Sequence, residues 1–165
     1  KMDRKLQRTL QGAIEQLDAL IDEEIQKTPG TKQRYDLIRS VYGVGPVLAL
    51  NFLALCDDLT RFASPRSLAC HAGVAPFERT SGKSLSGKPR VSPRANKRLK
   101  MLLHLSAMRV VREEGELRDY YERKVAEGKN RMLVLNNVRN KIIHRVFAVL
   151  ERGTPYIHQP DLQMT

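Results

Sequence analysis

Apolar residues recur at steps of three and four along the first part of the chain. They are Leu6, Leu10, Ile14, Leu17, Ile21 and Ile25. This spacing is typical of one face of an amphipathic helix of about two dozen residues, and Thr28-Pro29-Gly30 is expected to end it. The row has two interpretations. It is either the buried face of a core helix or the seam of a coiled-coil arm that packs on a partner.

Helical spacing continues through the rest of the chain and predicts an all-α fold without a clear strand. We expect further helices from Thr31 to about Ser40, from Pro46 onward, from Ser64 through Cys70, from Ser92 to about Glu113, from Glu116 to Glu127, and from Asn130 to Gly153. In the last helix the inward residues should be Leu135, Val138, Ile142, Val146 and Val149. We divide the chain into a coiled-coil-like connector helix (1–30), a helical domain (31–153) and a flexible tail (154–165).

The stretch Gly43-Val44-Gly45-Pro46 lies between two apolar segments and predicts a helix-hairpin-helix. The glycines allow a tight turn with positive φ, and Pro46 suits the first position of the next helix. Free N–H groups at that helix start can bind a phosphate, which makes Gly43 and Gly45 candidate nucleic-acid contacts. The alternative is a plain helical hairpin that binds nothing.

The charge of the chain favours a polyanionic partner. Lys and Arg number 29 against 18 Asp and Glu, a formal net charge of +11. DNA, RNA or an acidic membrane surface would fit. A membrane is the weakest of these, because no stretch approaches the roughly 20 apolar residues of a spanning helix. Cys56 and Cys70 fit reduced thiols, which indicates a cytoplasmic protein.

The cations concentrate between Arg79 and Lys100, a stretch without an acid. The segment from Gly73 to Val91, which overlaps this stretch, is expected to be a long loop. Ser92 as N-cap and Pro93 as first residue would then start a helix that displays its cations away from the core. Cations of this kind neutralise phosphates and release counterions. The candidate contacts are Arg79, Lys83, Lys88, Arg90, Arg94, Lys97 and Arg98, together with Asn96.

Motifs for metal or cofactor chemistry are not visible. The histidines are scattered, no Cys/His cluster has zinc spacing, and there is no phosphate-cradling Gly-rich loop. The adjacent Asp57-Asp58 pair is typical of capping or turn chemistry. The serines of the basic stretch could bind a phosphate or attack phosphorus, and attack requires a base or metal. The residues alone therefore favour phosphate binding.

Four segments together resemble one known family. They are "SVYGVGPVLA", "RFASPRSLACHAGVAP" with its Gly73–Pro76 turn, "SGKSLSGKPRVSPRANKRLKMLL" and "RNKIIHRVFAVL", which span about Leu37 to Leu150. Their order and spacing are similar to the C-terminal, serine-bearing domain of the insertion-sequence transposases that carry a RuvC-like DEDD domain. That family includes the pilin-gene invertases and the bridge-RNA-guided recombinases.

The resemblance implies that Ser81, which is followed by Gly82, is the nucleophile that joins covalently to DNA. It implies no cofactor in this chain, with Mg²⁺ held by an N-terminal RuvC-like domain. DNA and a structured guide RNA are the implied partners, and the first helix is the implied connector that assembles dimers or tetramers. The chain alone should bind nucleic acid without recombining it. Pro93 and Ala95 depart from the family's pattern, which has Lys and Gly there.

Other functions remain open at this point. A non-catalytic helix-hairpin-helix module would bind DNA or RNA with the same cations, but only a recombinase predicts a covalent protein–DNA species. A helix-hairpin-helix glycosylase would need a catalytic aspartate, for which Asp57 or Asp58 could serve. An RNA-binding factor, such as one associated with the ribosome, would have a similar charge.

Overall fold

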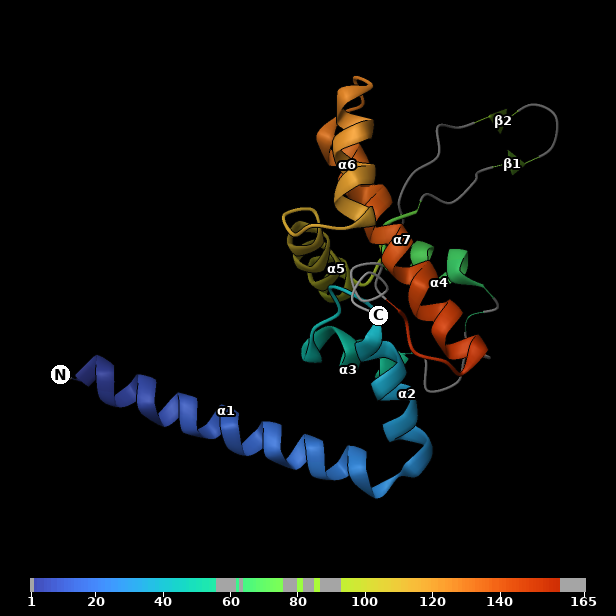
Figure 1. The fold of residues 1–165 in the computed structure, drawn as a ribbon. Helices are drawn as coiled ribbons and strands as arrows, with labels where there is room; N and C mark the ends of the chain where they lie inside the picture. Colours follow the sequence, from blue (N-terminus) through green and yellow to red (C-terminus); the bar gives the residue numbers. More distant parts are fainter. Residues whose placement is uncertain are drawn as a thin grey trace.

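The computed structural model describes residues 2–55, 62, 64–75, 80–81, 85–86 and 93–157. Within these residues it contains seven helices and one short antiparallel ladder, and so confirms the all-α class (Figure 1). The helices are α1 (Met2–Lys27), α2 (Pro29–Ser40), α3 (Pro46–Leu55), α4 (Pro65–His71), α5 (Lys97–Val110), α6 (Glu116–Ala126) and α7 (Arg131–Arg152). The strands are β1 (Thr80–Ser81) and β2 (Leu85–Ser86).

Helix α7 is the centre of the fold, since α2, α4, α5 and α6 all pack against it. Asn130 caps its start by accepting the Met132 and Leu133 N–H groups, and Gly153 ends it at φ 65°. Both ends were predicted. The five residues expected to point inward are all buried, which confirms the helical period of this segment. A 22-residue helix buried along one face thus organises the core.

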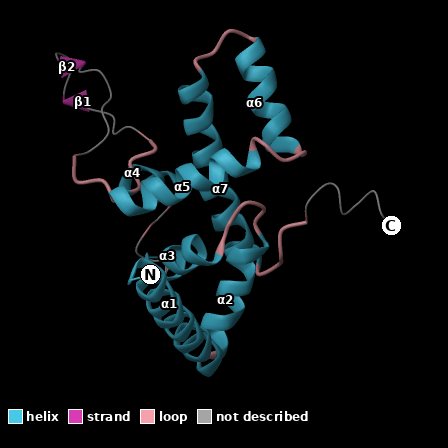
Figure 2. Ribbon diagram, turned by 90° about the vertical axis from the view of Figure 1, so that its left-hand side faces the viewer, coloured by secondary structure: helices cyan, strands magenta, loops and turns pink. Residues whose placement is uncertain are grey.

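Helix α1 extends away from this core, and Figure 1 shows it joined to the body only at its C-terminal end. In Figure 2 its N-terminal end faces the viewer. Ile25 is 6% exposed, whereas six other large apolar residues of α1 are 38% to 60% exposed. These are Leu6, Leu10, Ile14, Leu17, Leu20 and Ile21. The core-helix interpretation of the row is therefore wrong for all but its last turn.

Two helix starts differ from expectation. Helix α2 begins at Pro29 with Thr28 in extended conformation before it, so Thr31 is not its cap. Helix α5 begins at Lys97, not at Pro93, and ends at Val110 rather than Glu113. The Asn96 side chain accepts the Leu99 N–H at 2.9 Å, and the backbone N–H of Asn96 donates to the His71 carbonyl at 2.8 Å. These bonds fix the start at Asn96.

The segment expected to be a loop contains the ladder of β1 and β2. Thr80 pairs with Ser86, and Ser81 pairs with Leu85. Two-residue strands need no alternation of apolar side chains, so the sequence pattern gave no signal for them. None of the helices in the described part of the chain combines the length and apolar character that crossing a membrane requires.

Candidate nucleic-acid interface

The turn between α2 and α3 adopts one left-handed residue. Gly43 has φ 87°, whereas Gly45 is not among the residues with positive φ. The expectation of positive φ is thus confirmed for Gly43 and wrong for Gly45. Pro46 is the first residue of α3, as predicted.

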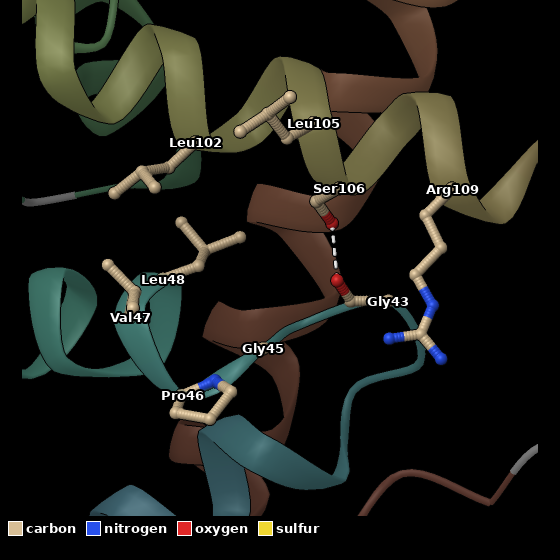
Figure 3. Close-up of a pocket in the computed structure, with 9 residues that line it drawn as sticks. All are labelled: Gly43, Gly45, Pro46, Val47, Leu48, Leu102, Leu105, Ser106 and Arg109. Carbon is tan, nitrogen blue, oxygen red and sulfur yellow. Dashed lines mark hydrogen bonds between the residues drawn. The ribbon is translucent and has the colours of Figure 1, made fainter. Parts of the chain in front are cut away.

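Three side chains fix this turn to its surroundings. Ser106 Oγ donates to the Gly43 carbonyl at 2.7 Å, as Figure 3 shows. Arg39 Nη1 donates to the Val44 carbonyl at 2.8 Å. A Cβ at Gly43 would overlap Val110 Cγ1, so the backbone here lies directly against α5. Only glycine satisfies both the close approach and the backbone angle.

A polar cluster ties the turn to the end of α5. The Tyr42 hydroxyl donates to Glu113 Oε2, and Arg109 Nε donates to Glu113 Oε1 at 3.0 Å. Burial first, and then the bond to Glu113, raise the pKa of Tyr42 to about 12. The bonds from Tyr42 and Arg109 lower the pKa of Glu113. The phenol therefore stays protonated at neutral pH and serves as a donor.

A cavity of about 220 Å³ opens beside the first turn of α3 (Figure 3). Its lining is mainly apolar, and Arg109 is its one charged residue. That guanidinium is already paired with Glu113. The cavity is smaller than most ligand pockets, and its walls offer little to a phosphate. The binding role of Gly43 and Gly45 stays a prediction.

The N-terminal end of α5 carries exposed cations. Arg94 lies in the turn before the helix, Lys97 and Arg98 lie in its first turn, and all three are exposed. Leu99 and Leu103 on the opposite side are fully buried. Cations at a helix N-terminus face the positive end of the helix dipole, at a cost of roughly 0.3–1 kcal/mol each. The first turn of α5 contains no acidic residue, so a bound polyanion would relieve the repulsion on Lys97 and Arg98.

The predicted site residues do not form one cluster in the described part of the chain. Arg94, Asn96, Lys97 and Arg98 gather at the start of α5, while Gly43 contacts its last turn, roughly 20 Å away along the helix. Ser81 lies in β1 opposite Leu85, and its side chain is outside the description. Several further candidates also lie outside the described residues: Arg79, Lys83, Lys88 and Arg90, as well as Asp57 and Asp58.

Sequence reasoning missed a buried polar network between α5 and α7. Arg139 is 6% exposed, and its Nη2 lies 2.8 Å from His104 Nδ1. Asn136 Nδ2 donates to the Val74 carbonyl at 2.6 Å, which ties α7 to the turn after α4. A signal was present, because Arg139 stands four residues after Leu135 and three before Ile142, on the apolar face of α7.

Metal ligands do not cluster in the described residues, where no group of three or more His, Cys, Asp or Glu could hold an ion.

Comparison with known proteins finds a family and several relatives. The model of the Transposase IS116/IS110/IS902 family matches residues 35–122, more than half of the chain. The chain is 33% identical over 144 residues to the insertion element IS116 uncharacterized 44.8 kDa protein of Streptomyces clavuligerus, covering 87% of the chain and 36% of that protein. It is 32% identical over 140 residues to the insertion element IS900 uncharacterized 42 kDa protein of Mycobacterium paratuberculosis, covering 84% and 34%.

A further similarity is to the pilin gene-inverting protein of Moraxella lacunata, at 26% identity over 145 residues, covering 87% of the chain and 45% of that protein. The chain thus spans about a third of the length of the insertion-element relatives and less than half of the pilin gene-inverting protein.

Proposed function

This chain belongs to the IS116/IS110/IS902 family of transposases, and we propose that it is the nucleic-acid-binding, nucleophile-bearing C-terminal domain of a DNA transposase or site-specific recombinase. The observation that carries the proposal is the exposed cationic start of α5, formed by Arg94, Lys97 and Arg98. Its charge opposes the helix dipole and suits a phosphate backbone. Within the chain it follows the ladder that contains Ser81.

Ser81 is the proposed nucleophile. Its Oγ would attack a DNA phosphorus, a new O–P bond would form, and the bond from phosphorus to the leaving sugar oxygen would break. The proton lost by the serine hydroxyl would pass through solvent, and the leaving oxygen would take up a proton to become a free hydroxyl. Cations of this chain would stabilise the charge that develops on the phosphate oxygens. Mg²⁺ held by the carboxylates of an N-terminal RuvC-like domain would supply activation of the hydroxyl, since no metal-binding group occurs in the described residues.

The remaining parts have proposed roles in the same assembly. Residues 1–30 would be a coiled-coil connector, residues 31–153 the helix-hairpin-helix-containing domain, and residues 154–165 a tail. The exposed apolar row of α1 supports the connector role, because it offers a seam for a second helix in a dimer or tetramer. The rigid turn at Gly43 supports the hairpin assignment. DNA is the proposed target, with a structured RNA as guide.

The first test measures binding by this chain to duplex DNA over a range of salt concentrations, using fluorescence anisotropy. We expect log affinity to fall linearly with log salt, with a slope of about −0.9 for each phosphate neutralised. A flat response would contradict the assignment of the α5 cations to the nucleic-acid backbone.

The second test seeks a covalent protein–DNA adduct in a two-domain protein that contains this chain, with DNA, guide RNA and Mg²⁺. Mass spectrometry should map the attachment to Ser81. The Ser81→Ala variant should lose the adduct, and Ser86→Ala, a change in the paired strand β2, should keep it. Binding without any adduct would instead make this chain a non-catalytic nucleic-acid-binding module.

A further inference from the structure

Arg139 is a buried cation without a carboxylate partner in the described part of the chain. Its residue is 6% exposed, and its Nε is buried without a hydrogen-bond acceptor. Its remaining contacts are neutral: His104 Nδ1 at 2.8 Å and Asn136 Oδ1 at 3.4 Å. Burying an unpaired charge is costly. The guanidinium nevertheless remains charged because of its very high ordinary pKa, so it creates a positive field between α5 and α7.

The contact with Arg139 fixes the proton of His104. A guanidinium has no acceptor, so His104 Nδ1 must accept the hydrogen bond from Nη2. The neutral ring then carries its hydrogen on Nε2. Burial, followed by the charge of Arg139, lowers the pKa of His104 and keeps the ring neutral. In this state His104 cannot act as a base, because Nδ1 is occupied and Nε2 is protonated.

His104 presents its remaining donor beside the cationic start of α5. On a helix, residues three, four and seven positions apart share a face, so Lys97, Lys100 and His104 form one row. Lys97 is exposed, and Lys100 and His104 are half-buried. No acceptor for His104 Nε2 occurs among the described residues. Because Nε2 is a donor and lies near the positive charge of Arg139, the best partner is an anionic group that only accepts hydrogen bonds.

We propose that His104 donates a hydrogen bond from Nε2 to a backbone phosphate of the bound nucleic acid, and that Arg139 is the positioning residue that holds it in this tautomer. This inference rests on the proposed nucleic-acid binding and extends the phosphate track from the first turn of α5 to its middle. Asn136, by its bond to Val74, links this contact to the turn that follows α4.

Salt titration distinguishes this contact from that of a lysine. His104→Ala should weaken DNA binding about tenfold to a hundredfold, the loss of one hydrogen bond to a charged acceptor. The slope of log affinity against log salt should stay unchanged, because a neutral donor displaces no counterion. Lys97→Ala should reduce the magnitude of that slope by about 0.9. His144→Ala, an exposed histidine of α7, is the matched control.

The tautomer is measured separately by ¹⁵N NMR of the histidine side chains in the ligand-free chain. The wild type should show His104 with a protonated Nε2 and an acceptor Nδ1, and Arg139→Met should abolish that pattern. If Arg139→Met disturbs folding, Arg139→Lys serves as a second variant. It keeps a donor at this position and should retain part of the tautomer pattern. Two results would overturn this inference. One is a DNA affinity that His104→Ala leaves unchanged, and the other is a His104 ring protonated on Nδ1. Absence of wild-type DNA binding would overturn the proposed function itself.

Discussion

Gly43→Ala should destabilise the protein by an amount that the structure lets us divide into two parts. Forcing an L-residue into the left-handed region at φ 87° costs roughly 1–2 kcal/mol. The new Cβ would also overlap Val110 Cγ1 and lie 3.3 Å from Ser106 Oγ. Overpacking of this kind costs roughly 1–3 kcal/mol. The free energy of unfolding should therefore fall by about 2–5 kcal/mol.

Denaturant unfolding followed by circular dichroism would measure this, with two controls. Gly45→Ala should change stability by less than about 0.5 kcal/mol, because a Cβ there meets open space and φ is not positive. In a Val110→Ala background, Gly43→Ala should cost only the backbone part, about 1–2 kcal/mol. Equal costs in both backgrounds would refute the steric argument, and equal effects at Gly43 and Gly45 would refute the assignment of the left-handed residue.

Other parts of the structure give further expectations. Ser106→Ala should lower the free energy of unfolding by about 1–2 kcal/mol in the same assay, since the Gly43 carbonyl loses its 2.7 Å donor; no change would mean that water replaces the hydroxyl. Because the pKa of folded Tyr42 is raised from 10.0 to about 12, its stabilising contribution is fully present below pH 10 and lost toward pH 12, so the stability gap between wild type and Tyr42→Phe should close over that range. A stability difference that stays constant over this pH range would show that ionisation of the Tyr42 phenol does not contribute to it. Replacing Leu10 and Leu17 together by Glu should reduce the assembled mass in analytical ultracentrifugation without lowering the melting temperature, because both residues are exposed in the single chain; a large fall in melting temperature would instead show that α1 folds onto its own domain.

Sequence pattern predicted the elements whose signals are local. The Asn130 cap, the Gly153 end and the buried row of α7 all follow from spacing and capping chemistry within one helix. The start of α5 was wrong because two capping patterns compete within five residues. Ser92-Pro93 resembles a helix start, but Asn96 is the residue that also bonds to His71 of α4. That choice depends on a tertiary contact.

In the candidate site, too, features set by local sequence were predicted and features set by tertiary contacts were not. The exposure of Lys97 and Arg98 follows from the apolar face of α5 and was predicted. That Gly43 requires glycine and Gly45 does not was not predicted, since it depends on how closely Val110 of another helix approaches. Nor does spacing reveal that Arg139 holds His104, because the two residues are 35 positions apart. Long-range pairs of this kind depend on how helices cross.

The attachment of α1 by one end has a mechanical consequence. A 26-residue helix is about 39 Å long, and the break at Thr28 and Pro29 lies at its fixed end. A rotation of about 10° at this break would therefore displace the far end by about 7 Å, from helix length alone. A small rotation at Thr28 therefore produces a large displacement of any partner bound at the N-terminal end of α1.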